Sequence, residues 1–303
     1  MQPSPLGRRV TLCWLVSLLW SAVVLNARLC AKSPIQLTDV TEATGIAFRH
    51  TDGGTGQRYI VETVSAGLAL FDYDGDGDID IYFLNGAALE APQSDTPPRN
   101  RLYRNEGDWR FTDVTDASGL GDTGYGLGIA VADYDNDGDP DVYLNNYGVN
   151  VLYRNNADGT FVDVTKDAGL GQAHRVGAGA CFLDLDNDGD IDVVVLNSRR
   201  EPTLLRNDSP AGGHWLQIEL QGDRSNRDGI GARVIVKAGD LQLTDEVHSG
   251  RGYQSHYGTR LHFGLGRHLR VDWVEVHWLG GSVDRLKDIA ADRLIHMTEG
   301  QAR

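Results

Sequence analysis

Short apolar runs alternate with tight polar loops through the first two thirds of the chain, and this pattern predicts β-strands rather than helices. A wholly apolar run stands before each of three aspartate-rich loops, and a run rich in Val, Ile or Tyr follows each loop. The preceding runs span residues 68–71, 129–132 and 180–183, and the following runs span 79–84, 141–144 and 191–196. Because a wholly apolar strand is typical of burial on both faces, the pattern predicts a buried strand, a loop and a second strand, three times over.

Other positions recur in phase with these loops. The sequence Asp-Val-Thr occurs at 39–41, 113–115 and 163–165, and each unit closes on a Leu-x-Arg-Asn segment. The closing segments span residues 102–105, 152–155 and 204–207. A constant phase indicates one supersecondary unit repeated along the chain, so residues 36–207 are predicted to form three blades of a propeller or of a related solenoid.

The three loops share one arrangement of charge, with aspartate at positions 1, 3, 5, 7 and 9 and glycine at position 6. Like charges a few Å apart repel by about 1 kcal/mol per pair even in water, and a divalent cation reverses the sign of that energy. The aspartates are Asp72, Asp74, Asp76, Asp78 and Asp80 in loop 1, Asp133, Asp135, Asp137, Asp139 and Asp141 in loop 2, and Asp184, Asp186, Asp188, Asp190 and Asp192 in loop 3.

Calcium fits this donor set best, because it accepts six to eight oxygen ligands in flexible geometry. We expect about three Ca²⁺ sites, with carboxylates at positions 1, 3, 5 and 9 and a backbone carbonyl at position 7. Magnesium demands a tighter octahedron, and softer metals would require His or Cys, which the loops lack. An EF-hand is excluded because position 12 is Phe83, Leu144 or Val195 rather than glutamate. A solvated acidic turn would explain one copy, but three copies in phase favour a metal.

The repeat stops after Asn207, and alternating strands then predict a second, smaller β domain at 208–299. Its expected strands span residues 215–220, 232–238, 261–263 and 274–278. Three glycine-rich segments separate them, reading NRDGIGA at 226–232, SGRGY at 249–253 and LHFGLG at 261–266. The fold class predicted is therefore all-β, with three propeller-type repeats and a C-terminal β domain.

These glycine-rich segments resemble the ASPIC/UnbV domain, and the aspartate loops resemble the FG-GAP or VCBS-type repeats that precede that domain in its family. The family includes cartilage acidic protein and proteins encoded in enediyne gene clusters. The resemblance implies a secreted, calcium-binding β-propeller with an appended β domain, and it implies no established catalytic residue. Propellers usually have four to eight blades, whereas this chain shows three. Three blades could form an open arc, dock on the C-terminal domain or close by self-association.

The N-terminus predicts export. Arg8 and Arg9 precede an apolar stretch from Val10 to Leu25, which has the length of a signal-peptide core and is short for a membrane span. Residues 1–31 are therefore expected to be a signal peptide, of ordinary or twin-arginine type, that directs the protein to a periplasmic or extracellular location. An uncleaved anchor stays open, but after cleavage no membrane span is expected.

Net charge and cysteine content limit the partners of the protein and the bonds that can stabilise it. The formal net charge is −15, and losing the leader with its three arginines makes it −18, which excludes nucleic acid as a partner. Two of the three cysteines lie in the leader, so Cys181 has no partner for an internal disulfide. Something other than a disulfide must stabilise the fold.

The leading interpretation is a secreted calcium-binding module for binding or adhesion, with an unidentified extracytoplasmic protein or glycan as its partner. The alternative is an exported enzyme or biosynthetic-pathway accessory protein whose site lies in the C-terminal domain. Arg227, Asp228 and Arg251 lie in glycine-rich connections there and form a possible ligand site. No catalytic residue is assigned, because no known nucleophile or metalloprotease motif is present.

Overall fold

The structure is a computed structural model that describes residues 37–54, 56–57, 59–63, 66–89, 96–170, 175–198, 201–209, 213–250, 256 and 258–301. The chain divides into two compact units, Met1–Thr41 and Glu42–Arg303, and every strand lies in the second. The predicted signal peptide lies outside the described residues. Among those that are described, no helix is long and apolar enough to cross a membrane.

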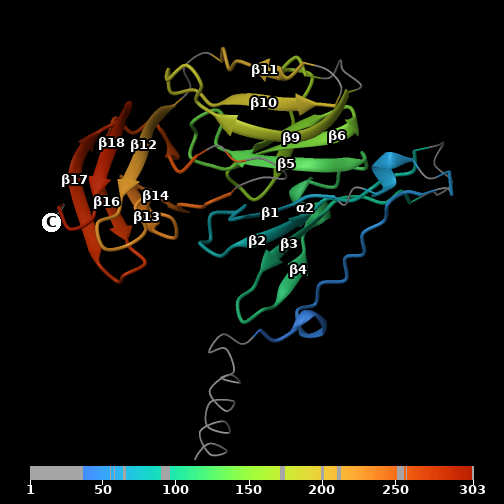
Figure 1. The fold of residues 1–303 in the computed structure, drawn as a ribbon, viewed down its shortest axis with the longest axis horizontal. Coiled ribbons are helices and arrows are strands. Elements are labelled where there is room, and N and C mark those ends of the chain that lie inside the picture. The colour runs from blue at the N-terminus through green and yellow to red at the C-terminus, as the bar shows by residue number, and fades with distance from the viewer. Residues whose placement is uncertain are drawn as a thin grey trace, which may run out of the picture. The chain divides into compact units, whose positions relative to one another are not determined.

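The first repeat forms a four-stranded antiparallel blade, here blade 1 (Figure 1). Its strands, in spatial and chain order, are β1 (Leu68–Phe71), β2 (Asp80–Phe83), β3 (Arg101–Asn105) and β4 (Phe111–Asp113). Two short 3-10 helices, η1 (Thr41–Ala43) and η2 (Ile60–Thr63), precede the blade, and one turn of helix, α2 (Thr115–Ser118), follows it.

Blades 2 and 3 repeat this plan and are joined to each other. Blade 2 consists of β5 (Gly126–Ala132), β6 (Asp141–Gly148), β7 (Val151–Asn155) and β8 (Phe161–Asp163). Blade 3 has three described strands, β9 (Arg175–Leu183), β10 (Asp192–Asn197) and β11 (Thr203–Leu205). The end of β6 pairs with the start of β9, which links the two blades into one sheet.

Each blade has two faces, because side chains alternate across a strand. We define the forward face as the one that carries Tyr82 in blade 1 and the equivalent positions Tyr143 and Val194, and the backward face as the opposite one. The forward face of blade 1 packs on the backward face of blade 2 in one buried cluster, and the forward face of blade 2 packs on the backward face of blade 3 in another. Each large side chain buried there contributes about 1.5–3 kcal/mol.

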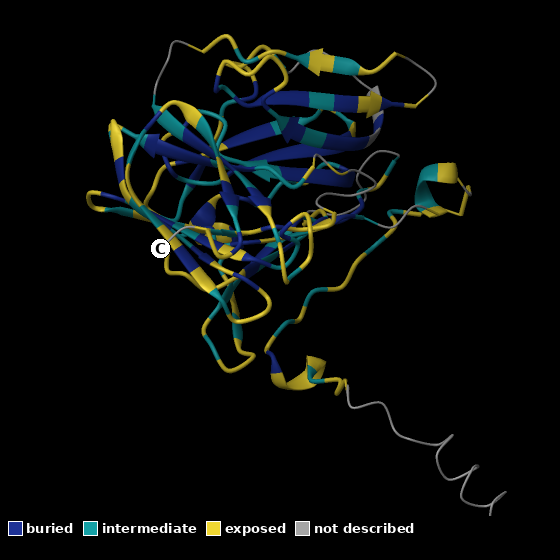
Figure 2. Ribbon diagram, turned by 60° about the vertical axis from the view of Figure 1, so that its left-hand side comes forward, coloured by how far each residue is buried: buried dark blue, intermediate teal, exposed yellow. Residues whose placement is uncertain are grey.

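The C-terminal domain is a sandwich of two sheets. One sheet has the order β15-β12-β18, and the other has the order β14-β13-β16-β17. The strands are β12 (His214–Gln221), β13 (Arg233–Ala238), β14 (Leu241–Glu246), β15 (Leu261–Gly266), β16 (Arg270–His277), β17 (Val283–Ala290) and β18 (Arg293–Thr298). A separate core of buried side chains fills the space between the sheets. Figure 2 colours the ribbon of the whole chain by burial, and its buried stretches, in dark blue, lie mainly on strands.

The all-β prediction is confirmed, and every strand predicted from the sequence is present. The expectation that each strand before a loop is buried on both faces holds only where a blade lies on each side. Leu68 and Leu70 of β1 are 51% and 61% exposed, because no blade among the described residues covers the backward face of blade 1. The short outer strands β4 and β8, which contain the Phe-x-Asp segments, were not predicted.

A buried carboxylate holds one end of the sandwich together. Glu299 Oε2 accepts hydrogen bonds from the backbone N–H groups of Asp223, Arg224 and Ser225 at 3.0, 2.8 and 2.8 Å. Its Oε1 accepts one from Ser282 Oγ at 2.7 Å. These donors favour the ionised form, so the pKa of Glu299 lies well below its usual range, the Ser225 N–H being the largest cause.

We expect Glu299→Gln to lower the melting temperature at pH 7, because an amide leaves some of these buried donors unpaired. A lowered carboxyl pKa stabilises the fold fully above the unfolded value of about 4.3, and the stabilisation is lost as pH falls toward the folded pKa. The difference in melting temperature between wild type and variant should therefore shrink below about pH 4. Thermal denaturation at several pH values measures this, with the exposed Glu201→Gln as control. Equal melting temperatures at pH 7 would contradict the assignment.

Candidate metal centre

Each aspartate loop joins the first strand of a blade to the second, and the three loops fold alike. Position 4 has a left-handed backbone in every copy, with φ of 76°, 60° and 62° at Gly75, Asn136 and Asn187. Glycine and asparagine are the residues that adopt this conformation most readily. The glycine at position 6 is also left-handed in each loop. This backbone turns the loop so that its carboxylates face inward.

The position-9 aspartate ties each loop to its blade. One carboxylate oxygen accepts the backbone N–H of position 2 at 3.0 Å, and the other accepts the N–H of the asparagine that closes the repeat at 2.8 Å. The three sets are Asp80 with Tyr73 and Asn105, Asp141 with Tyr134 and Asn155, and Asp192 with Leu185 and Asn207. The aspartate at position 9 and the Leu-x-Arg-Asn segment therefore form one structural unit.

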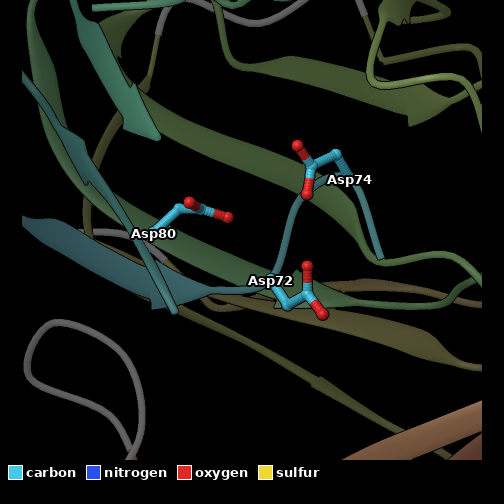
Figure 3. Close-up of side chains that lie close together, drawn as sticks. All are labelled: Asp72, Asp74 and Asp80. Atoms are coloured by element: carbon cyan, nitrogen blue, oxygen red, sulfur yellow. The ribbon is translucent and has the colours of Figure 1, made fainter. Parts of the chain in front are cut away.

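Three carboxylates in every loop have oxygens within 4.8 Å of one another. In loops 1 and 2 these belong to positions 1, 3 and 9, and Figure 3 shows the first set. In loop 3 they belong to positions 1, 3 and 5. The sets are Asp72, Asp74 and Asp80; Asp133, Asp135 and Asp141; and Asp184, Asp186 and Asp188. Two oxygens that share a calcium ion at 2.3–2.6 Å lie at most about 5 Å apart, so this spacing fits one ion per loop.

Two of these carboxylates have a buried oxygen with no hydrogen-bond partner. They are Asp135 Oδ1 in loop 2 and Asp184 Oδ1 in loop 3, and Asp184 is only 5% exposed. An unsatisfied buried acceptor costs about 1–3 kcal/mol, and more when it is charged. A cation coordinated by these oxygens would remove that cost. The observation is independent of the sequence pattern and supports a metal at both loops.

Burial raises the pKa of several loop carboxyls, and neighbouring aspartates raise it further. The pKa of Asp80 is raised to about 7, and that of Asp135 and of Asp139 to about 6, with desolvation as the largest cause in each. The pKa values of Asp133 and Asp141 are raised well above the usual value for the same reasons. The loops therefore disfavour their own negative charge unless a cation compensates it.

The C-terminal domain sits directly on loops 2 and 3. Gln217 of β12 donates its Nε2–H to Asp184 Oδ2 at 2.8 Å, and its Oε1 accepts a bond from Arg260. Arg260 also donates to Asn187 Oδ1 at 3.3 Å. Position 1 and position 4 of loop 3 are therefore both bonded to the C-terminal domain.

Asn136 connects loop 2 to loop 3 and to the C-terminal domain. Its Nδ2 donates to the Gly189 carbonyl at 3.0 Å, and its own carbonyl accepts the Gly266 N–H at 2.9 Å. His262 Nε2 lies 2.6 Å from Asn136 Oδ1, and this bond requires the tautomer protonated at Nε2. Burial lowers the pKa of His262 to about 4, so the ring is neutral at pH 7. Trp215 stacks on this ring with centroids 6.0 Å apart.

A second set of bonds joins neighbouring blades through the loops. The side chain of Asn155 in blade 2 donates to the carbonyl of Tyr73, at position 2 of loop 1. Asn207, which follows blade 3, donates in the same way to Tyr134 at position 2 of loop 2. Asn105 of blade 1 donates to Ile79 of its own blade at 3.1 Å. Each loop except loop 3 is thus held by the asparagine of the next blade.

The structure brings together only some of the predicted metal ligands. It brings together the carboxylates at positions 1 and 3 of every loop, but leaves Asp76, Asp137 and Asp192 outside the groups. Position 7 was predicted to bind the ion through its backbone carbonyl, and no carboxylate from that position belongs to a group. Asp190 Oδ1 instead accepts a bond from Asn136. Which atoms ligate an ion stays a prediction.

The possible ligand site in the C-terminal domain stays a prediction. Arg227 and Asp228 are exposed, and Arg251 lies outside the described residues. Sequence reasoning missed Gln217, His262 and Gly264 as contacts of the aspartate loops. The LHFGLG segment was the available signal, since a glycine inside a strand often marks close backbone approach.

Comparison with known proteins gives a family match for the repeats and another for the C-terminal domain. Residues 222–303 match the family described as ASPIC and UnbV, and residues 72–144 and 133–195 match the FG-GAP-like repeat. The chain therefore carries FG-GAP-like repeats followed by an ASPIC/UnbV domain, as the sequence resemblance predicted.

Three relatives share the name cartilage acidic protein 1. The protein of Mus musculus is 30% identical over 235 residues, which is 72% of this chain and 34% of the relative. The protein of Homo sapiens is 31% identical over 235 residues, 72% of this chain and 33% of the relative. The protein of Xenopus tropicalis is 34% identical over 90 residues, 29% of this chain and 14% of the relative. The chain thus spans at most about a third of the length of these relatives.

We expect Gly264→Ala to loosen the C-terminal domain from loop 2. A Cβ at this position would clash with the Asp133 carboxylate and lie 2.8 Å from the Asn136 carbonyl carbon. Overpacking of this kind costs about 1–3 kcal/mol. Thermal denaturation measures the loss, with Gly250→Ala as a matched control, because a Cβ on Gly250 meets nothing within 4 Å. Equal melting temperatures for the two variants would show that the close approach is absent in solution.

Proposed function

We propose that this chain, which combines FG-GAP-like repeats with an ASPIC/UnbV domain, is an exported binding module that is stabilised by calcium. The observation that carries the proposal is the pair of buried carboxylate oxygens without partners, one in loop 2 and one in loop 3. Each belongs to a group of three carboxylates whose spacing suits a single ion. Export is supported by the leader pattern of residues 1–31.

Calcium is preferred over magnesium because of what surrounds the carboxylates. Their remaining lone pairs already accept backbone N–H groups, for instance Asp72 from Gly75 and Gly77. The loops therefore offer oxygens in an irregular arrangement fixed by the backbone. Calcium tolerates such geometry, whereas magnesium requires a near-ideal octahedron and retains its water ligands.

The ions are proposed to be structural. Asp133 and Asp184, at position 1 of loops 2 and 3, lie beneath the C-terminal domain and beside its β12–β15 sheet. Neutralising these carboxylates would stabilise the loops and the domain that covers them together. The rigid assembly would then present exposed loops to an extracytoplasmic protein or glycan.

Calorimetry should find about three calcium ions per chain, and calcium should raise the melting temperature relative to chelator. Ligand at one hundred times its dissociation constant stabilises a protein by about 2.7 kcal/mol per site. Asp133→Asn should remove one site, whereas the exposed Asp167→Asn should remove none. No heat of binding, together with unchanged melting in calcium and chelator, would refute the proposal.

Hydrogen exchange tests whether the ions support the domain contact. The Gly266 amide is bonded to the Asn136 carbonyl at the boundary between loop 2 and the C-terminal domain. We expect peptides that contain this amide to exchange faster in chelator than in calcium. Peptides from β16, a central strand of the other sheet that pairs with β13 and β17, provide the internal control. Equal acceleration of both peptides would indicate general unfolding instead of a local role.

A further inference from the structure

Both ends of the row of blades expose apolar surface. On the backward face of blade 1, Leu68 and Leu70 are 51% and 61% exposed. On the forward face of blade 3, Leu196 and Leu204 are 57% and 64% exposed. Aliphatic side chains gathered in this way on a sheet face mark an interaction surface.

One exposed face is a forward face and the other is a backward face, the two kinds that pack together inside the chain. Leu204 occupies the position of Leu102 and Leu152, which are 0% and 5% exposed between blades. Leu68 likewise occupies the position of Ile129, which is 2% exposed. Each internal interface joins one forward face to one backward face. The free forward face of blade 3 is therefore complementary to the free backward face of blade 1, and neither is complementary to itself.

A polar contact follows the same rule. Between blades, the asparagine that closes one repeat donates to the position-2 carbonyl of the preceding loop, as Asn155 does to Tyr73. At the ends of the row these partners are missing among the described residues. No blade follows blade 3 to donate to the carbonyl of Leu185, and no loop precedes blade 1 to accept from Asn105. The ends therefore match in polar groups as well as in apolar ones.

The two free faces of one chain do not meet, because blade 2 lies between blades 1 and 3 (Figure 1). We propose that two copies of this chain associate head to tail, the forward face of blade 3 in each covering the backward face of blade 1 in the other. Two such contacts related by a two-fold axis close a ring of six blades, which lies within the usual range of four to eight. The ring of Phe48 stacks on that of Phe83 on the backward face of blade 1, with centroids 4.8 Å apart. Blade 3 of the second copy would therefore pack over β1, where this face is uncovered.

Sedimentation equilibrium of the protein in calcium should give twice the mass of one chain. Leu70→Glu and Leu204→Glu each place a charge in both contacts, and each should weaken the dimer by about 100-fold or more. Leu269→Glu, on an exposed leucine of the C-terminal domain, should leave the dimer intact. Matched melting temperatures would show that the variants are folded, as expected for exposed positions.

Mixing the two variants distinguishes a head-to-tail dimer from a dimer in which the same face of each chain packs on its counterpart. A pair made from one Leu70→Glu chain and one Leu204→Glu chain has both charges in one contact and leaves the other contact unaltered. The mixture should therefore dimerise at concentrations where each variant alone is monomeric. A monomeric wild type, an open polymer, or a dimer that survives either substitution unchanged would overturn the proposal.

Discussion

The fold depends on aspartates that hold the backbone in place and at the same time repel one another. Asp80, Asp141 and Asp192 each accept two backbone N–H groups, and without these bonds a loop would not be attached to the closing strand of its blade. Burial makes two of these carboxylates, Asp80 and Asp141, costly as anions, as their raised pKa values indicate. The repeat therefore combines local order with a local excess of negative charge. A bound cation is the simplest way to neutralise that charge while keeping the loop ordered.

The parts of the structure that the sequence predicted are those governed by contacts within one repeat. Apolar runs, loop positions and the closing Leu-x-Arg-Asn segment all act within a blade, so their spacing is visible in the chain. The contact between Asn136 and His262 joins residues that are 126 positions apart, and no local pattern reports it. For the same reason the strand predicted at 261–263 stopped short of Gly264, which lies within β15 and whose lack of a side chain lets loop 2 approach. Exposure of Leu68 and Leu70 was also missed, since it depends on the number of blades.

The three loops share one sequence pattern but have different surroundings. Loop 1 is bordered by the β7–β8 turn of blade 2, where Gly159 lies near Asp74. Loops 2 and 3 are covered by the C-terminal domain, and a single residue, Asn136, is bonded to both loop 3 and that domain. Similar chemistry in the chain thus places one aspartate loop at a blade edge and two at a domain boundary, where a bound ion would couple metal binding to domain packing.

The strand order of the sandwich has a consequence for how the chain acquires its structure. β12, which contacts loop 3 through Gln217, pairs in parallel with β18, the last strand of the chain. The sheet that covers the loops is therefore incomplete until β18 has been synthesised. Contacts of such long sequence separation form late, after local hairpins. The blades can assemble early as separate hairpins with solvated carboxylates, and the arrival of the C-terminal strands converts those carboxylates into buried groups.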